Sequence, residues 1–342
     1  MIEYNKGVLC IMKKIKFLFK ALLRMDYKSF FKITKKVAKK SKRLYIITLI
    51  DIIYCGIKYQ AGYMDYQEFE FYNLNNKQRE TYLTRGKNNY IVKKYNNKEY
   101  WHYLSNKLEF NEKFKKYLKR DYIDLTKASA KDFEKFINDK EYVIAKEVDN
   151  CGGLGISKIK VKDYNSKILY NKLIENKQYL VEEIIKQNSK INKLYANSVN
   201  TIRLFTFNDG KNVHIINSIF RIGNSGFVDN FSSGGMYTFL DNNGKVIVPA
   251  IDKEDNKIDI HPTSKEKIVG FVVPNYDKAK QMVKEAAKEI SEIKYIGWDV
   301  AITENDACLV EGNEFPGVFQ IKPSFKKDAE GLIPTYKKYI KF

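Results

Sequence analysis

Two short stretches near the C-terminus decide the fold of this chain: GWDVAI at residues 297–302 and LVEGNEFPG at residues 309–317. Each is an apolar, strand-like run that carries oxygen ligands, and a tight turn at residues 304–306 would join the two into a hairpin. Asp299, Glu311 and Asn313 could then lie side by side. Two carboxylates and an amide carbonyl are hard ligands that suit Mg²⁺ when phosphates complete its coordination. A lone Asp or Glu at a strand end more often faces water, so this interpretation depends on phosphate-binding features elsewhere.

The composition is that of a globular, enzyme-sized protein. The 342 residues are 44% hydrophobic, which allows two or three lobes with ample core. The four cysteines (Cys10, Cys55, Cys151 and Cys308) lie far apart, without a C-x-x-C pair or a His at ligand spacing. This argues against a zinc site or a disulfide framework and favours a reducing, cytoplasmic setting. Cys151 could be a reactive thiol, but a small residue tolerated in a loop is the favoured interpretation.

The positive charge is concentrated near the N-terminus. The chain has a net charge of +20, and the segment from Lys13 to Arg43 contains thirteen Lys and Arg against the single acid Asp26. Apolar residues recur there at helical spacing, which predicts a basic amphipathic helix or helix pair. Such a helix could lie on an anionic membrane surface or be a solvated face packed on the body, two readings of equal weight. Nucleic acid comes third, because no recognised binding module accompanies the charge.

The apolar run at residues 44–57 is a candidate membrane segment. It is interrupted by Asp51 and is shorter than the ~20 residues that a spanning helix needs. We therefore expect a buried helix. The N-terminus carries no convincing secretory signal, and translation could begin at Met12.

Hydrophobic periodicity divides the rest of the chain into short elements. Residues 63–83 are aromatic-rich and irregular, and residues 100–118 have helical periodicity. The expected strands are residues 142–146, 156–161, 179–182, 201–207, 213–221 and 245–249, and further helices are expected at residues 165–176 and 276–293. This order predicts an α+β fold with mostly antiparallel sheets.

A glycine-rich stretch follows the first of these strands. Lys146 ends the strand, and NCGGLGI at residues 150–156 leads into the next one. Glycines allow a hairpin loop to fold over a triphosphate, and a preceding Lys can reach the same charge. The spacing fits neither a P-loop nor a dinucleotide fingerprint, and an ordinary hairpin stays an alternative. The stretch YLVEEII at residues 179–185 could be a nucleotide hinge or an ordinary strand end.

In this order the motifs resemble the ATP-grasp superfamily, over about residues 90–322. They resemble more narrowly the sugar-transfer-associated ATP-grasp family, found among capsule and surface-polysaccharide biosynthesis proteins. The narrower likeness is carried by NSVNTIR at 197–203, FRIG at 220–223, VDNFSSGG at 228–235, HP at 261–262 and GWD at 297–299. The resemblance implies two α+β lobes with mainly antiparallel sheets that clamp ATP, after a basic helical N-terminal region.

The expected organisation follows from this resemblance. It comprises a basic helical N-terminal region (1–75), a helical lead-in (76–140), a first lobe with the glycine loop and adenine hinge (141–190), a second lobe with the metal and substrate site (191–325), and a C-terminal helix or tail (326–342).

The resemblance also assigns roles to particular residues. ATP would be bound by Lys107, Lys146, Gly152, Gly153, Gly155, Glu182, Glu183 and Ile185, although which of the two acids faces the ribose stays open. The metal ligands would be Asp299, Glu311 and Asn313. The γ-phosphoryl group or an acceptor carboxylate would be held by Arg203 and Arg221, whose guanidinium groups bind such oxygens in pairs. The substrate would meet Asp229, Asn230, Ser232, Ser233, Gly234, Gly235 and His261, of which His261 could instead order a turn.

The implied chemistry is carboxylate activation by ATP with two Mg²⁺ ions, for which Mn²⁺ could substitute. An amine would displace phosphate from the acyl phosphate and leave an amide. The product would be a surface or capsular polysaccharide precursor that carries an amino acid or amino sugar, for example on a uronic acid. The enzyme would be cytoplasmic, either free or peripheral on the inner face of the plasma membrane with residues 12–57 on anionic lipid; no nucleic-acid partner is expected. Alternatives are a kinase-like phosphotransferase on a small molecule and a non-catalytic, membrane-docked scaffold.

The sequence departs from the family pattern in three places. Residues 1–100 look helical and basic, where many carboxylate–amine ligases have a Rossmann-like domain. The common Asp-Lys pair is Asn106-Lys107, and Gly297 replaces the arginine that often precedes the metal-binding Asp by two residues. Stabilisation of an oxyanion would then fall to Arg203 or Arg221.

Overall fold

The computed structural model describes residues 25–149 and 155–342. The chain forms two compact units. We call Val92–Pro316 the sheet unit, and Met1–Ile91 together with Gly317–Phe342 the helical unit. Among the described helices, none is long and apolar enough to cross a bilayer.

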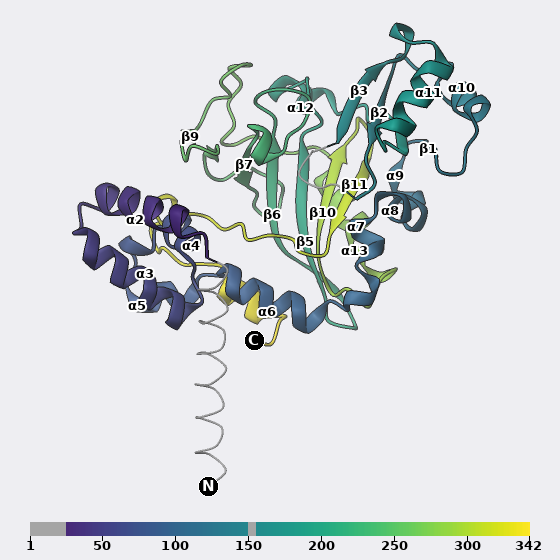
Figure 1. Cartoon of the computed structure of the whole chain (residues 1–342). Coiled ribbons are helices and arrows are strands. Elements are labelled where there is room, and N and C mark those ends of the chain that lie inside the picture. The colour runs from purple at the N-terminus through teal and green to yellow at the C-terminus, as the bar shows by residue number, and fades with distance from the viewer. Residues whose placement is uncertain (1–24, 150–154) are drawn as a thin grey trace. The chain divides into compact units, whose positions relative to one another are not determined.

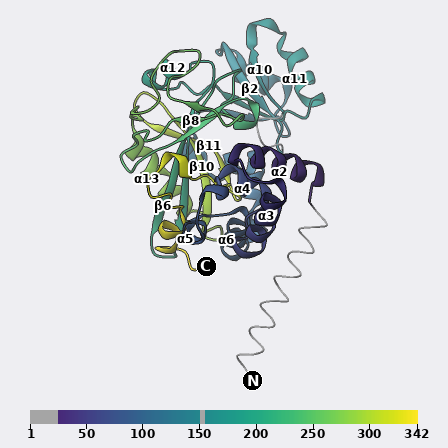
Figure 2. The same ribbon diagram turned by 90° about the vertical axis from the view of Figure 1, so that its left-hand side faces the viewer.

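The first sheet of the sheet unit has four antiparallel strands in the order β1-β4-β2-β3. These are β1 (Tyr122–Asp124), β2 (Tyr142–Lys146), β3 (Ile156–Lys160) and β4 (Leu180–Glu183). Helices α10 (Ala130–Ile137) and α11 (Ser166–Glu175) lie against one face of this sheet (Figures 1 and 2). Val143, Ala145 and Val181 pack into that helix-covered core. Because side chains alternate along a strand, Ile144, Lys146 and Glu182 lie on the opposite face.

The second sheet has seven antiparallel strands in the order β11-β10-β5-β6-β7-β8-β9. They are β5 (Thr201–Asn208), β6 (Val213–Ile222), β7 (Met236–Phe239), β8 (Ala250–Ile251), β9 (Lys257–Ile258), β10 (Tyr295–Ile302) and β11 (Ala307–Asn313). Helix α13 (Tyr276–Lys288) packs on β5, β6, β10 and β11 and buries Ala279, Val283 and Ala286. The sheet unit also contains α12 (Ser189–Leu194) and the single-turn helices η2 (Lys98–Tyr100), η3 (Val161–Asp163) and η4 (Phe231–Ser233).

The hairpin expected from the sequence is β10–β11. Its turn is closed by the amide of Thr303, which donates to the carbonyl of Asp306 at 2.9 Å. All of β10 is buried, which explains its continuous apolar sequence. The α+β class with antiparallel sheets is confirmed, and the strands predicted near residues 142, 156, 179, 201 and 213 are present.

One expected element is wrong. Residues 245–249 form only isolated bridges, because Pro249 has no amide hydrogen to continue a ladder, and β8 begins directly after it. The helical character expected at residues 100–118 is confirmed, but the stretch is divided into α7 (His102–Ser105), α8 (Lys107–Lys113) and α9 (Lys115–Leu118). Asn106 causes the first break, since its side chain accepts the amides of Leu108 and Glu109, both at 3.1 Å.

The helical unit confirms a helical region before residue 100. It contains α2 (Tyr27–Ser41), α3 (Tyr45–Tyr59), α4 (Tyr63–Glu68), η1 (Phe71–Asn73), α5 (Asn76–Thr81), most of α6 (Arg85–Tyr95), η5 (Pro323–Phe325) and α14 (Ile333–Lys337). The stretch expected to be irregular at residues 63–83 thus contains two α-helices. Side chains cap both, Asp65 on the amide of Gly62 and Asn75 on that of Gln78.

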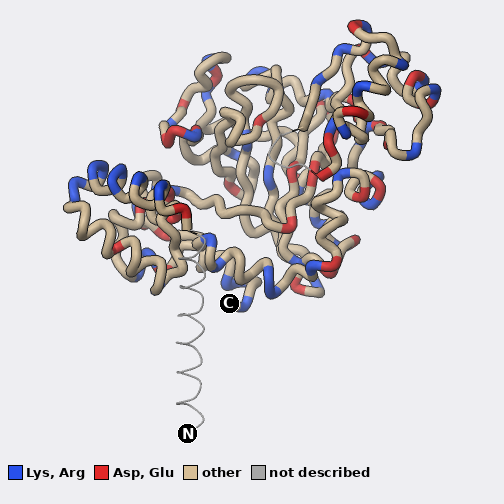
Figure 3. Tube along the Cα trace, viewed as in Figure 1, with Lys and Arg blue, Asp and Glu red and all other residues tan. Residues whose placement is uncertain are grey.

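Helix α3 is anchored in this unit by Asp51. Its carboxylate accepts two hydrogen bonds from Arg79, both at 2.7 Å, and one from the hydroxyl of Tyr66 at 2.6 Å. Only the side of α3 that carries Ile52 and Cys55 is buried. The expectation of a buried helix at residues 44–57 is therefore wrong, because a helix packed on one side leaves its other side in solvent. Figure 3 shows that basic residues gather on the neighbouring α2, of which only residues from 27 onward are described.

Candidate functional site

The predicted metal ligands lie on one face of the β10–β11 hairpin. Asp299 is paired in register with Glu311, and Gly297 with Asn313. The register shifts just beyond Asp299, which locally reshapes the strand pairing at the carboxylates. The amide nitrogen of Asn313 donates to the carbonyl of Gly297 at 3.3 Å, so its carbonyl oxygen points the other way. The hairpin thereby gathers two carboxylates and one amide oxygen.

Two arginines from neighbouring strands converge on Asp299. Arg203 on β5 is in register with it and binds both carboxylate oxygens through two hydrogen bonds of 2.6 Å. Arg221 on β6 adds a third bond of 2.6 Å. Burial opposes ionisation of Asp299, but the two guanidinium charges outweigh it and hold the pKa of this carboxyl well below its usual range.

Glu311 sits at the open side of this cluster. Its side chain is 42% exposed, and one of its oxygens lies 3.6 Å from Arg203. Packing by protein groups and the negative charge of Asp299 together raise the pKa of Glu311 to about 7. The pair thus has one firmly ionised carboxylate and one that is easily protonated until a cation approaches.

The structure explains why position 297 is a glycine. A Cβ at this position would lie 2.7 Å from Cβ of Pro316 and 3.5 Å from Cδ of Arg203. A larger side chain therefore has no room, chiefly because of Pro316, and Arg203 of β5 lies in ordinary contact beside it.

Asp229 supports Arg221 from behind. Its carboxylate lies 3.0 Å from Arg221 and accepts the amide and hydroxyl of Thr201 at 2.8 and 2.5 Å. Arg221 also hydrogen-bonds the side chain of Asn230. Asp229 is buried. These contacts position the arginine and leave the Asp229 carboxylate directed at protein groups.

The loop at residues 230–235 is closed by hydrogen bonds between its own backbone groups. The amides of Ser233 and Gly235 both donate to the carbonyl of Asn230 at 3.0 Å, and the amide of Gly234 donates to Phe231 at 3.3 Å. A Cβ on Gly235 would lie 2.2 Å from the carbonyl oxygen of Asp229. In this conformation these three amides are used within the turn, and the structure shows no contact that directs them or Ser232 to a substrate.

His261 is fixed by backbone groups on both sides of its ring. Nε2 donates to the carbonyl of Gly223 at 2.8 Å, and Nδ1 accepts the amides of Thr263 and Ser264, each at 3.2 Å. The ring is fully buried and stacks on Tyr195. Of the two roles left open by the sequence, these contacts favour the ordering of a turn.

The four-stranded sheet brings together Lys146 and Glu182. Glu182 is buried and forms ion pairs with Lys146 and with Arg120, the latter at 2.7 Å. Its carboxylate also accepts a hydrogen bond of 2.8 Å from the side-chain amide of Asn111. Burial opposes ionisation of Glu182, but Arg120 and Lys146 lower the pKa of its carboxyl to about 2. Glu183 lies on the helix-covered face and pairs with Lys140 at 3.2 Å. Glu182, and not Glu183, therefore shares the face of Lys146; Ile185 follows β4 and is partly exposed.

Of the remaining phosphate-binding candidates, Lys107 and Gly155 lie among the described residues. Nζ of Lys107 donates to the carbonyl of Val148 at 3.2 Å, immediately before that loop. Gly155 has φ +69°, and a Cβ there would lie 2.6 Å from the side chain of Glu147, so both its conformation and its space favour glycine. Gly152 and Gly153 lie outside the described residues.

Arg120 connects the two sheets. Besides Glu182 on β4, it donates to the carbonyl of Leu309 on β11 at 2.6 Å, two residues before Glu311. Strands β4 and β11 are thus linked by one side chain. Sequence reasoning missed Arg120 and Asn111, because each acts through a contact distant in sequence and neither belongs to a recognisable motif. Thr201 lies in the motif NSVNTIR, but its contact with Asp229 could not be read from the sequence.

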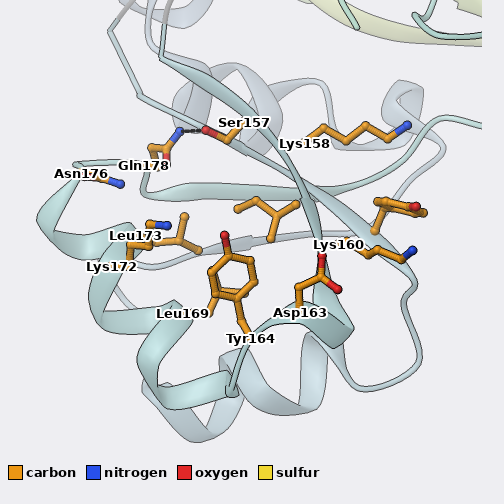
Figure 4. Close-up of a pocket in the computed structure, with 12 residues that line it drawn as sticks. Ser157, Lys158, Lys160, Asp163, Tyr164, Leu169, Lys172, Leu173, Asn176 and Gln178 are labelled. Carbon is orange, nitrogen blue, oxygen red and sulfur yellow. Dashed lines mark hydrogen bonds between the residues drawn. The ribbon is translucent and has the colours of Figure 1, made fainter.

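A cavity of about 440 Å³ lies elsewhere, between β3 and α11 (Figure 4). Its wall includes Tyr164 and Lys172, and Gln178 donates to Ser157 at 2.8 Å across one end. None of the predicted ATP, metal or substrate residues lines it. It is a surface feature of the small sheet and not part of the site described above.

The family model described as sugar-transfer associated ATP-grasp matches residues 86–330. The chain belongs to this family. The match includes both sheets and the Arg203–Asp299–Glu311 cluster, so the family resemblance and the ATP-grasp fold expected from the sequence are confirmed.

Several solved structures are similar in fold. The ATP-grasp ligase PsnB, complexed with minimal precursor, Mg and ADP, is 12% identical, with a TM-score of 0.39 over 66% of this chain and 54% of that one. D-alanine–D-alanine ligase from Bacillus anthracis is 12% identical, with a TM-score of 0.38 over 69% and 62%. N5-carboxyaminoimidazole synthetase from Staphylococcus aureus, complexed with ADP, is 14% identical, with a TM-score of 0.39 over 63% and 45%. This chain thus spans little more than half of PsnB. No curated protein matches it.

The side-chain oxygens of Asp299, Glu311 and Asn313 fit a magnesium nucleotide. Among the described residues, no group of three or more His, Cys, Asp or Glu side chains could hold a metal ion by itself. Asp299, Glu311 and Asn313 supply fewer oxygens than an octahedron requires, which is the arrangement expected when phosphates complete the shell. Both oxygens of Asp299 are bound by arginines in this structure, so a metal ion there would share an oxygen with a guanidinium group or displace it.

Proposed function

We propose that this protein is an ATP- and Mg²⁺-dependent carboxylate–amine ligase. The observation that carries the proposal is the alignment of Arg203, Asp299 and Glu311 across three adjacent strands, with Arg221 on the fourth. Phosphoryl transfer mainly requires positioned charge, and this cluster supplies two guanidinium groups next to two carboxylates. Membership of an ATP-grasp family supports the same chemistry.

In the proposed reaction a substrate carboxylate oxygen attacks the γ-phosphorus of ATP, and ADP leaves. An amine then attacks the acyl carbon, loses a proton and expels inorganic phosphate, which leaves an amide. One or two Mg²⁺ ions, held by Asp299, Glu311 and Asn313, would neutralise the charge of the phosphates. Lys146 and Lys107 would bind phosphate oxygens, Glu182 would face the nucleotide, and Arg203 and Arg221 would hold the acceptor carboxylate and then the acyl phosphate.

The family description, sugar-transfer associated, supports a substrate drawn from sugar metabolism. We propose a carboxylate-bearing precursor of a surface or capsular polysaccharide, joined to an amino acid or amino sugar. Such a role would place the enzyme in the cytoplasm, at the inner face of the membrane.

Isotope transfer tests the acyl phosphate. The protein is incubated with Mg²⁺-ATP, sugar carboxylates labelled with ¹⁸O in both carboxylate oxygens, and a pool of amino acids and amino sugars. We expect the released phosphate to carry one ¹⁸O and the amide product to keep the other, both read by mass spectrometry. Glu311→Gln, the negative control, should lose turnover.

Two other outcomes would reject the proposal in different ways. A phosphorylated product that forms without inorganic phosphate would identify a kinase-like enzyme. Binding of Mg²⁺-ATP without any ADP formation that depends on carboxylate and amine would identify a scaffold.

A further inference from the structure

Helix α3 presents an apolar outer face that the fold of the helical unit leaves exposed. Six residues spaced along one side of the helix form it, and we call them the α3 face: Ile46, Ile47, Ile50, Ile53, Tyr54 and Ile57. Each is between 39% and 60% exposed among the described residues. At 100° per residue the six positions fall within a single stripe, and none of them is charged.

This exposure is built into the unit and is not a local irregularity. Thr48, Ile52, Cys55 and Tyr59 bury the opposite side of α3, and Asp51 holds the helix through Arg79 and Tyr66. The helix therefore cannot rotate to bury its isoleucines without breaking a buried ion pair. A contiguous apolar stripe on an anchored helix marks an interaction surface.

The charge of the neighbouring helix indicates what lies on that surface. Helix α2 packs against α3 and exposes Lys28, Lys32, Lys35, Lys36 and Lys39. Its N-cap Asp26 is the only acid between Lys13 and Arg43. A partner must therefore accept apolar side chains and attract a dense positive charge. An anionic bilayer does both, because headgroup charge attracts Lys while acyl chains receive Ile and Tyr.

We propose that the α3 face inserts into the surface of an anionic membrane, with α2 as the electrostatic contact beside it. The sequence suggested that residues 12–57 as a whole lie on anionic lipid; the insertion now falls to residues 46–57, within the run first expected to be buried. Nucleic acid would use the lysines but leave the isoleucines in water. The inference does not depend on the ligase activity.

Vesicle flotation of the full chain tests the proposal. The vesicles are phosphatidylcholine with a minor fraction of phosphatidylglycerol, and phosphatidylcholine alone. We expect the double variant Ile50→Asn, Ile53→Asn to reduce partition into the anionic vesicles by about tenfold or more, because two apolar side chains no longer leave water. Ile168→Asn on α11, which removes an equally exposed isoleucine of the sheet unit, should leave flotation unchanged.

A second variant reports insertion directly. Ile50→Trp should show fluorescence quenched by brominated acyl chains, whereas the native chain, whose two Trp lie in the sheet unit, should show little quenching. Equal flotation of the double variant and the native chain, or no quenching of Ile50→Trp, would overturn the proposal. So would self-association without vesicles that the double variant abolishes, because a second copy would then cover the face. Mg²⁺-ATP binding, measured in parallel, should be unaffected in all three variants.

Discussion

The two oxygens of Asp299 accept three charged hydrogen bonds, two from Arg203 and one from Arg221. Asp299 is therefore expected to stabilise the fold as well as to bind the metal. Its neighbour Glu311 lies farther from Arg203, at 3.6 Å, and is partly exposed. The two carboxylates thus require different experiments, since removal of each disturbs the protein to a different degree.

We expect Glu311→Gln to weaken the Mg²⁺-dependent part of ATP binding by about tenfold or more, because one anionic metal ligand is lost. The variant should keep near-native stability. Thermal shifts with ATP, with and without Mg²⁺, measure the effect. Glu292→Gln, an exposed substitution away from the hairpin, is the control. An unchanged Mg²⁺-dependent shift in Glu311→Gln would reject the metal assignment.

Asp299→Ala should destabilise the native state by about 3–5 kcal/mol, because two buried guanidinium groups lose their partner. Asp299→Asn keeps the shape and some of the hydrogen bonds, so it should cost less. Urea unfolding of the two variants measures the difference. Equal stability of Asp299→Ala and the native protein would mean that the arginines find other partners.

We expect the free energy of unfolding to depend on pH through His261. Burial lowers the pKa of its imidazole below the ordinary value of 6.5, and protonated Nδ1 could no longer accept the amides of Thr263 and Ser264. As pH falls through the unfolded-state value, the unfolded chain binds the proton first. The contribution is therefore complete above about pH 6.5 and is lost as the pH falls below it.

Unfolding free energies between neutral pH and pH 5 should fall less steeply in His261→Gln than in the native protein. A slope unchanged in His261→Gln would contradict the assignment.

At the scale of elements, the β10–β11 hairpin is held from behind by short helices. A Cβ on Gly312, between Glu311 and Asn313, would lie 2.7 Å from Leu104 of α7 and 3.1 Å from Phe110 of α8. Trp298 packs on Phe114 and donates to the hydroxyl of Thr206 at 2.9 Å. Glycine at 312 thus lets β11 pack closely against α7 and α8.

Gly312→Ala should lower stability by about 1–3 kcal/mol through overpacking, and it should weaken Mg²⁺-ATP binding as the strand shifts. Gly56→Ala inside α3, where a Cβ would lie at an ordinary 3.6 Å from the carbonyl oxygen of Ala61, should instead add about 0.5–1 kcal/mol of stability. Chemical unfolding and nucleotide titration check both. Unchanged stability of the Gly312→Ala variant would show that α7 and α8 move easily to accommodate the added Cβ.

At the scale of the whole molecule, the proposed activities lie on separate compact units. Mg²⁺-ATP should slow amide hydrogen exchange in β2, β4, β10 and β11 of the sheet unit. Anionic vesicles should slow it in α2 and α3 of the helical unit. We expect Glu311→Gln to remove only the first protection, and the Ile50→Asn, Ile53→Asn variant only the second. Loss of both protections in either variant would contradict separate sites.

The sequence by itself determined the elements whose pattern is local. The β10–β11 hairpin follows from two apolar runs and a turn, and ordered motifs with Asp299 and Arg203 specify the family. These signals are readable because strand periodicity and turn chemistry depend on neighbours in the chain.

Tertiary structure decided what depends on distant contacts. Only packing shows that Pro316 lies too close to Gly297 for a larger side chain, that Arg120 joins Glu182 to β11, and that Asp229 binds Arg221. Packing also overturned the burial of α3, because an apolar run of that length has no intrinsic preference between a core and an exposed interaction surface. Which side of a helix meets water is fixed by the partners that fold against it, and those partners are far away in sequence.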